Sequence, residues 1–231
     1  MVGAIAGVAS ATPYRFDWDG VTAGGISNAA GKVNTIKIEY DTVSQAYSFE
    51  STIKKHGGRL ADGFWLVTSA GPDPKGIVNE LPIFYFDGSG ATPTLSVFNY
   101  NGQNNSNSWQ NPGQLIAKFT GSAVSKINVD ANTRTFKFNI PGAAINSFVP
   151  PTGDPTQWDG LKFGSKLGLW YHPVDDLTTN YSNNGTLNRF DYSTQGWVDG
   201  SNYTTEIVPE PATMLALAAG IAAMARKRRN K

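Results

Sequence analysis

Apolar and polar residues alternate along most of the chain with the two-residue period of β-strands. Residues 32–40 are typical, with Val33, Ile36 and Ile38 at the apolar positions. Asn, Ser, Thr and Gly are abundant between such stretches, and these residues favour turns. The pattern predicts about eleven short strands, over residues 32–40, 46–53, 64–67, 81–86, 94–100, 114–120, 124–130, 135–140, 166–171, 186–192 and 203–208.

Two pairs of these strands are predicted to form hairpins, because only a short polar turn separates them. The turns are residues 41–44 and Ala131-Asn132. Helix is expected only near residues 142–148 and in the C-terminal tail. We therefore predict an all-β fold, a single β-sandwich of jelly-roll or lectin-like form over residues 12–207, with a C-terminal transmembrane helix.

The first residues, 1–11, are expected to be the remnant of a signal peptide. Residues 2–8 are small and apolar, and Ala9-Ser10-Ala11 fits the small-x-small rule for signal peptidase, with cleavage before Thr12. The usual basic n-region is not present, because Arg15 is the first basic residue.

The tail, residues 208–231, has three parts in order. Residues 208–211 read Val-Pro-Glu-Pro, residues 212–225 are uncharged, and residues 226–231 are basic. The uncharged run is short for a hydrocarbon core of ~30 Å and would be a weak anchor, although arginine at its end can snorkel. Clustered positive charge beside an apolar segment stays in the cytoplasm, so the preceding domain is expected on the other side. The basic residues are Arg226, Lys227, Arg228, Arg229 and Lys231.

This tail resembles the PEP-CTERM sorting signal of Gram-negative bacteria. The residues that match are Val208, Pro209, Glu210 and Pro211, the apolar run and the basic end; the prolines hold the glutamate in an extended backbone. The resemblance implies recognition by exosortase, a membrane-embedded cysteine transpeptidase that removes the tail. The protein would be anchored transiently in the inner membrane and then pass to the cell surface or exopolysaccharide matrix. An ordinary tail anchor or a buried terminal helix is the alternative.

The domain also resembles, more loosely, a group of uncharacterised PEP-CTERM surface proteins. The similar stretches include residues 62–67, 71–76, 168–173 and 196–200. This resemblance implies no particular activity.

Charge and cysteine content exclude some classes of protein. The tail carries five of the 19 basic and one of the 18 acidic residues, which leaves 14 basic and 17 acidic side chains in the domain, a net charge of −3. A nucleic-acid partner is not expected, because it would need a basic face. The chain has no cysteine, so the stability of an exported domain must come from its core.

Residues for catalysis are scarce, and we do not expect an enzyme. The two histidines, His56 and His172, are predicted in a turn and at a strand end. Neither a Gly-x-Ser-x-Gly nor a His-Glu-x-x-His motif occurs. Glu39 and Glu50 fall in one predicted hairpin and could face each other as a glycosidase pair, but solvated strand-face glutamates are the simpler interpretation.

No cofactor is expected, although structural calcium is conceivable. Calcium takes six to eight oxygen ligands, and several aspartates lie in predicted loops. Aspartate in a turn more often bonds its own backbone. The aspartates considered are Asp17, Asp19, Asp73, Asp87, Asp130, Asp175, Asp176 and Asp199.

Sugar binding is suggested by two tryptophans in polar loops, Trp109 and Trp158. An aromatic face with amides beside it can stack on a sugar ring and bond its hydroxyls. Trp65, Trp170 and Trp197 are expected in the core. Two function classes stay open, a structural or adhesive matrix protein and a carbohydrate-binding module for exopolysaccharide, with a polysaccharide-active enzyme as a distant third.

Overall fold

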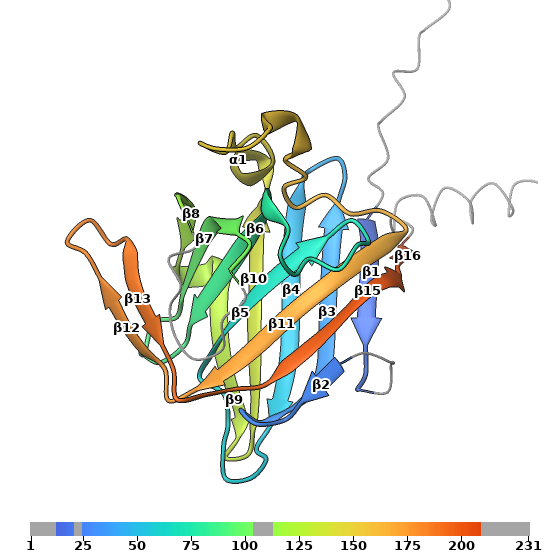
Figure 1. Cartoon of the computed structure of the whole chain (residues 1–231). Helices are drawn as coiled ribbons and strands as arrows, with labels where there is room; N and C mark the ends of the chain where they lie inside the picture. Colours follow the sequence, from blue (N-terminus) through green and yellow to red (C-terminus); the bar gives the residue numbers. More distant parts are fainter. Residues whose placement is uncertain (1–12, 21–24, 104–112, 209–231) are drawn as a thin grey trace, which may run out of the picture.

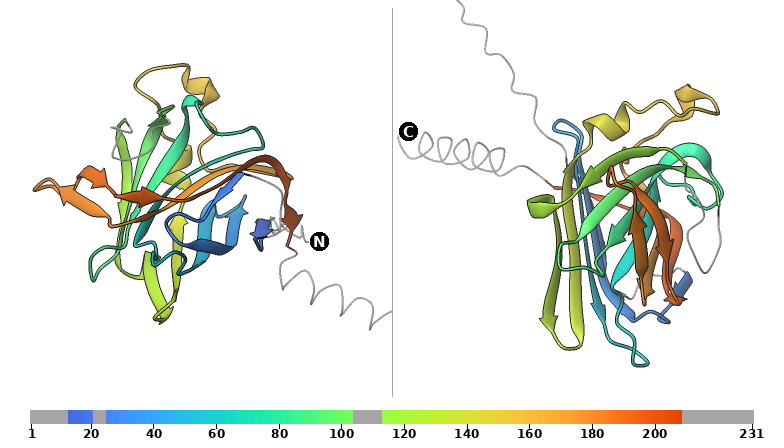
Figure 2. Two further views of the ribbon diagram at one scale, coloured as in Figure 1. Left: turned by 60° about the horizontal axis from the view of Figure 1, so that its bottom comes forward. Right: turned by 90° about the vertical axis from the view of Figure 1, so that its left-hand side faces the viewer.

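The computed structural model describes residues 13–20, 25–103 and 113–208, and almost all of the regular structure in them is strand (Figure 1). The all-β prediction is confirmed. Most of the strands fall into two antiparallel sheets, which lie face to face as two layers (Figure 2).

The first sheet has six strands in the order β16-β1-β3-β4-β10-β9. Both predicted hairpins are in it, and they pair with each other through β4 and β10. Alternation explains its register, because Ile38, Phe49 and Phe138 stand opposite one another and point into the core. The strands are β1 (Pro13–Trp18), β3 (Lys32–Asp41), β4 (Ala46–Lys54), β9 (Val124–Asp130), β10 (Thr133–Pro141) and β16 (Glu206–Ile207).

The second sheet follows the order β2-β15-β11-β5-β6-β7-β8, with β14 beside β11. Its central strands are buried on both faces, so they appear in the sequence as continuous apolar runs. The strands are β2 (Gly25–Ser27), β5 (Gly63–Ser69), β6 (Val78–Asp87), β7 (Thr94–Asn101), β8 (Leu115–Phe119), β11 (Lys166–Asp175), β14 (Thr194–Gln195) and β15 (Trp197–Thr204).

Aromatic rings join the two sheets across the main core. Phe64 of β5 contacts Phe49 of β4 at a centroid distance of 5.0 Å and Phe136 of β10 at 5.6 Å. Tyr47 stacks on Phe84 at 5.5 Å, and its hydroxyl bonds that of Thr68 at 3.0 Å. With no cysteine in the chain, this ring packing is the main link between the layers.

A second apolar cluster covers the outer face of the eight-stranded sheet. The hairpin of β12 (Thr178–Tyr181) and β13 (Leu187–Asp191) packs on this cluster and extends from the end of β11 (Figure 1). Phe190 of this hairpin packs against Tyr85 of β6 at a centroid distance of 5.0 Å. The hairpin therefore covers part of the outer face of the eight-stranded sheet, over its central strands.

Two differences from the prediction stand out. The strand β11 was expected to end at Tyr171, but it continues through Pro173 to Asp175. Pro173 is tolerated because pairing with β15 ends at Tyr171 and pairing with β14 begins at Val174, so its missing N–H falls between two ladders. The strand β1 was not predicted, although Tyr14, Phe16 and Trp18 alternate clearly.

Helix is minor in the described part of the chain. The helix α1 (Ala143–Asn146) lies where one was predicted, and two 3-10 turns are η1 (Gly121–Ala123) and η2 (Pro155–Gln157). Within the described ranges, no helix has the length and apolar character needed to cross a membrane. The predicted transmembrane segment, residues 212–225, and the signal remnant, residues 1–11, lie outside the described residues.

Candidate functional site

The sorting tail leaves the domain directly from a sheet edge. Strand β16 pairs with β1, with Ile207 opposite Tyr14. The backbone N–H of Val208 then donates to the carbonyl oxygen of Pro13 over 3.0 Å. Val208 is thus the last described residue and the first of the Val-Pro-Glu-Pro motif, so little spacer separates the fold from the motif. Pro209, Glu210, Pro211 and the basic residues 226–231 lie outside the described residues.

The outer face of the six-stranded sheet forms an open polar hollow of about 470 Å³. Glu39 and Glu50 both line it, but they are not directly opposed: Glu39 stands opposite Ser48, and Glu50 opposite Lys37. Each also has a cationic partner, Arg15 for Glu39 and Lys137, at 2.6 Å, for Glu50. The hydrogen bond to Glu39 is the main cause that raises the pKa of Arg15. This arrangement fits the expected solvated strand-face glutamates.

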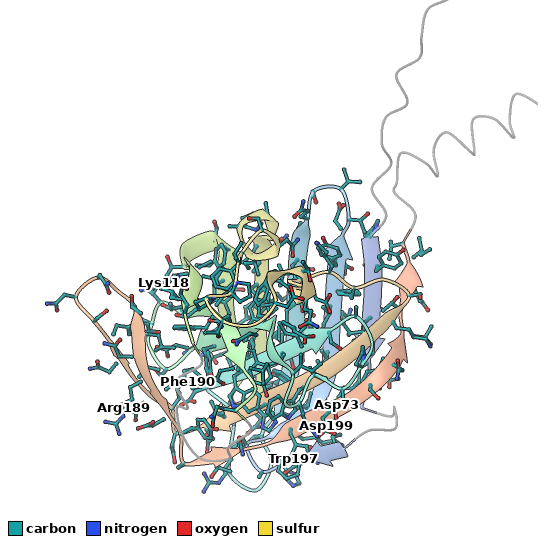
Figure 3. All side chains as sticks on the ribbon, turned by 45° about the horizontal axis from the view of Figure 1, so that its top comes forward. Asp73, Lys118, Arg189, Phe190, Trp197 and Asp199 are labelled. Carbon is teal, nitrogen blue, oxygen red and sulfur yellow. The ribbon has the colours of Figure 1, made fainter. Side chains whose placement is uncertain are left out.

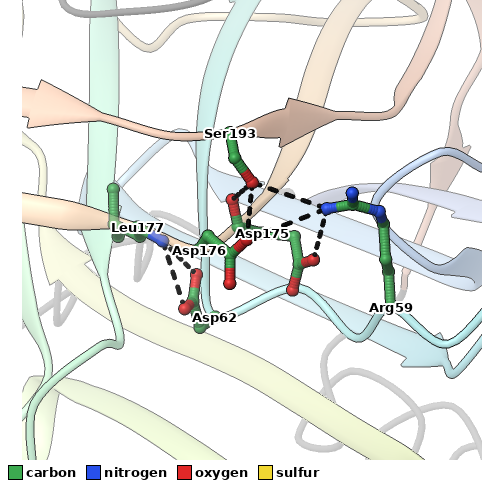
Figure 4. Close-up of polar contacts among 6 residues, drawn as sticks. All are labelled: Arg59, Asp62, Asp175, Asp176, Leu177 and Ser193. Atoms are coloured by element: carbon green, nitrogen blue, oxygen red, sulfur yellow. Dashed lines mark hydrogen bonds and ion pairs between the residues drawn. The ribbon is translucent and has the colours of Figure 1, made fainter.

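The loop aspartates mostly bond neighbouring backbone or a cation. Asp130 accepts from the N–H of Asn132 at 2.6 Å, and Asp73 from the N–H of Lys75 at 3.0 Å. Asp175 pairs with Arg59 at 3.0 Å, beside Asp176 (Figure 4). Over the described part of the chain, no three acidic or histidine side chains are grouped as ligands for a metal ion.

Of the two predicted sugar-binding tryptophans, Trp158 is buried and Trp109 lies outside the described residues. The indole N–H of Trp158 donates to the carbonyl oxygen of Ile145 over 2.8 Å, and its ring contacts Phe148 at 5.1 Å. The expectation of an exposed stacking face at Trp158 is therefore wrong. Its polar neighbours in sequence belong to the η2 turn, which packs the indole inward.

Trp197 was expected in the core and is instead 38% exposed. It opens strand β15 beside the edge strand β2, opposite Ser27. Val198 is the inward residue of this strand, so Trp197 and Asp199 share the outer face. Figure 3 shows both at the rim of the sheet. The sequence Gly196-Trp-Val-Asp-Gly200 could have indicated this exposure, because residues two apart in a strand share a face and the aspartate is expected to face solvent.

His172 lies next to Trp197 in the outer face, with ring centroids 6.3 Å apart. Its imidazole stacks on Trp65 at 3.8 Å with an interplanar angle of 9°. Its Nδ1 lies 3.1 Å from Oε1 of Gln195, which also accepts from the hydroxyl of Tyr192. Because an amide oxygen only accepts, Nδ1 carries the proton and Nε2 presents a bare lone pair.

Burial keeps this imidazole neutral. Desolvation lowers the pKa of His172 to about 3, against the smaller opposing effect of the hydrogen bond to Gln195. Within the described ranges, Nε2 is buried and has no hydrogen-bond partner. A buried acceptor of this kind is uncommon, because leaving it unpaired costs free energy. His172 was predicted at a strand end and is in fact inside β11.

Lys75 and Asp199 form an ion pair beside this aromatic group. Gly25 of β2 makes room for the Asp199 carboxylate, which occupies the space that a Cβ would take. The backbone N–H of Lys75 donates to the carboxylate of Asp73, two residues before it, over 3.0 Å. We call Trp197, Asp199, Lys75 and the underlying His172 the Trp197 surface.

These features define a class: an all-β domain whose edge strand runs directly into a proline-bounded sequence motif. The PEP-CTERM protein-sorting motif matches residues 208–229, so the chain is a PEP-CTERM sorting domain-containing protein. The chain matches no curated protein and no solved structure. The motif implies processing by exosortase, export, and a cell-surface or extracellular location in bacteria.

Proposed function

We propose that the protein is a structural or adhesive component of an exopolysaccharide or biofilm matrix, displayed through its sorting tail. The observation that carries this proposal is the PEP-CTERM motif at residues 208–229, joined with little spacer to the edge strand β16. A sorting tail delivers the whole domain to the cell surface. There the domain would act structurally, by binding other components of the matrix.

The finer steps belong to the same proposal. The host is a Gram-negative bacterium, and signal peptidase removes residues 1–11. Residues 212–225 anchor the chain transiently in the inner membrane, with the basic residues 226–231 in the cytoplasm, until exosortase cuts near Pro209-Glu210-Pro211. The domain, residues 12–207, is a single β-sandwich of jelly-roll or lectin-like form, supported by the two face-to-face sheets.

The polar surface of the domain supports a matrix role. The hollow on the six-stranded sheet presents hydroxyl, amide and paired charged groups, including Ser48, Ser125 and Asn139. Such groups exchange hydrogen bonds readily with a hydrated polysaccharide. A carbohydrate-binding module is the second candidate, and the exposed Trp197 favours it over the third, a polysaccharide-active enzyme.

The test is matrix retention and cohesion in the host. A strain lacking the gene receives either the full chain or a chain ending at Ile207. We expect the full chain in the matrix fraction, with matrix cohesion restored. The truncated chain should pass into the medium and leave cohesion low. Equal cohesion with both chains, or unchanged cohesion when the gene is deleted, would contradict the structural role.

A further inference from the structure

We infer that the Trp197 surface is a contact site for an uncharged hexopyranose polymer, with the Trp197 indole stacking on a sugar ring and the Lys75–Asp199 pair bonding its hydroxyls. This inference rests on the proposed matrix function and names the contact that would serve it.

The first support is the exposure of Trp197 on a rigid strand. Its indole is 38% exposed, and its neighbours in the outer face, Trp65 and Trp170, are buried. Trp170 packs edge-on to Trp65 at a centroid distance of 4.4 Å, so the aromatic side chains beside Trp197 are held by packing. An indole held in this way offers apolar area at low conformational cost, as sugar stacking requires.

The second support is the set of polar groups around the indole. Lys75 supplies donors and Asp199 supplies acceptors, so the pair can serve two neighbouring hydroxyls of one sugar. Gly25 leaves room for the carboxylate, because any side chain there would displace it. Site geometry is therefore set by backbone as well as by the ion pair.

The third support is the unpartnered Nε2 of His172. This atom is a neutral acceptor, buried beside Trp197 and without a hydrogen-bond partner among the described residues. A sugar hydroxyl is a suitable donor for it. Because Nε2 is covered, the hydroxyl reaches it only after a small rearrangement of surface side chains.

Local charge selects the class of sugar. The Lys75 ammonium is already paired with Asp199, and Asp73, which accepts from the backbone N–H of Lys75, adds a second carboxylate to the same stretch of chain. An acidic sugar would meet repulsion from the two carboxylates, whereas a neutral sugar would not. This local charge favours a neutral hexopyranose chain over an anionic polysaccharide.

The experiment measures retention of the processed protein, extracted from the cell surface, on the host's own exopolysaccharide. Trp197→Ala should lower the affinity by about tenfold or more, because the stacking contact is lost. Trp197→Phe should keep much of the binding, and Lys75→Gln should weaken it severalfold. The matched control is Ile127→Ala, an exposed apolar residue of β9 on the other sheet, which should bind like the wild type.

The outcomes separate this inference from the proposed function. If the wild type is retained and Trp197→Ala is retained equally, the site is wrong while the matrix role stands. If the wild type is not retained at all, both the site and the polysaccharide contact are wrong. If Trp197→Ala lowers the melting temperature, Trp197→Phe decides: a well-folded Phe variant that has lost as much retention as the Ala variant overturns the stacking role.

Discussion

The surroundings of Asp62 destabilise the charged form of its carboxylate. It lies just before β5 and accepts from the N–H of Leu177 at 3.2 and 3.3 Å (Figure 4). Desolvation raises the pKa of Asp62 to about 6, and Asp175 adds to the rise, while the bond from Leu177 and the charge of Arg134 act against it. The position therefore favours a neutral acceptor.

This shift gives a pH-dependent prediction. The folded pKa of Asp62 lies above its unfolded value, so its contribution to stability is full below about pH 4 and is lost as pH rises through about 6. Asp62→Asn keeps an acceptor for Leu177 without the charge. We expect the variant to melt higher than wild type at about pH 7.5, with the difference shrinking at about pH 4. Asp130→Asn, in an exposed turn, is the control for charge removal. A variant that melts lower at both pH values would contradict this account.

Phe64 is the residue that links the two sheets most directly. Its ring is fully buried and contacts rings of both layers, including Phe49, Phe86 and Phe136. Phe64→Ala should destabilise the domain by about 3–5 kcal/mol, because it leaves a cavity between the sheets. Chemical denaturation checks the value, with the exposed Val149→Ala as control. A loss similar to that of the control would mean that the sheets do not share one core.

At the scale of elements, the buried carboxylate of Asp87 bonds strand β12 of the β12–β13 hairpin at two positions. Asp87, at the end of β6, accepts from the hydroxyls of Thr179 at 2.7 Å and Tyr181 at 2.8 Å. It also accepts from the N–H and hydroxyl of Ser89. Lys118 holds the far end, through the carbonyl of Gly185 at 2.7 Å.

Removing this carboxylate should loosen the hairpin. Asp87→Ala leaves several donors without their acceptor, which should cost about 1–3 kcal/mol. Hydrogen exchange should speed up over residues 178–191 first, because the hairpin is the element that Asp87 holds. Arg189→Ala, on the exposed side of the same hairpin, should change little. Unchanged exchange in Asp87→Ala would show that apolar packing of Phe190 alone holds the hairpin.

Strands with clear alternation were predictable from the sequence, and those defined by tertiary contacts were not. Residues 32–40 and 46–53 match β3 and β4 closely, because their apolar period fixes both strand and register. The strand β12 is Thr-Thr-Asn-Tyr, which carries no apolar period, and it forms because Asp87 and β13 hold it. The end of β11 was missed because the tolerance of Pro173 depends on which strands lie beside it.

At the scale of the whole molecule, the tail was predictable because a linear motif needs no fold to be recognised. The matched residues, 208–229, carry their own charge and proline pattern. The Trp197 surface needed the structure, because it joins Lys75 from the loop before β6 to β11 and β15, far apart in sequence. Strand-like surroundings in the sequence predicted a core position for Trp197, and a polar loop predicted a surface position for Trp158; the structure has Trp197 exposed and Trp158 buried.

The two ends of the described domain lie side by side. Val208 bonds Pro13, so the chain enters and leaves at the same edge of the six-stranded sheet. An enzyme in the membrane can then reach the tail motif without unfolding the core, since β16 is only two exposed residues. This arrangement is compatible with the proposed single cut beyond Val208.

The intact mass of the protein extracted from the cell surface tests this account most directly. In a host with exosortase, the mass should correspond to a chain cut near Pro209-Glu210-Pro211, without any peptide from residues 215–224. In a strain lacking exosortase, the same peptide should be found, and the protein should remain in the membrane fraction. Surface protein that still carries residues 215–224 in the host with exosortase would contradict the account.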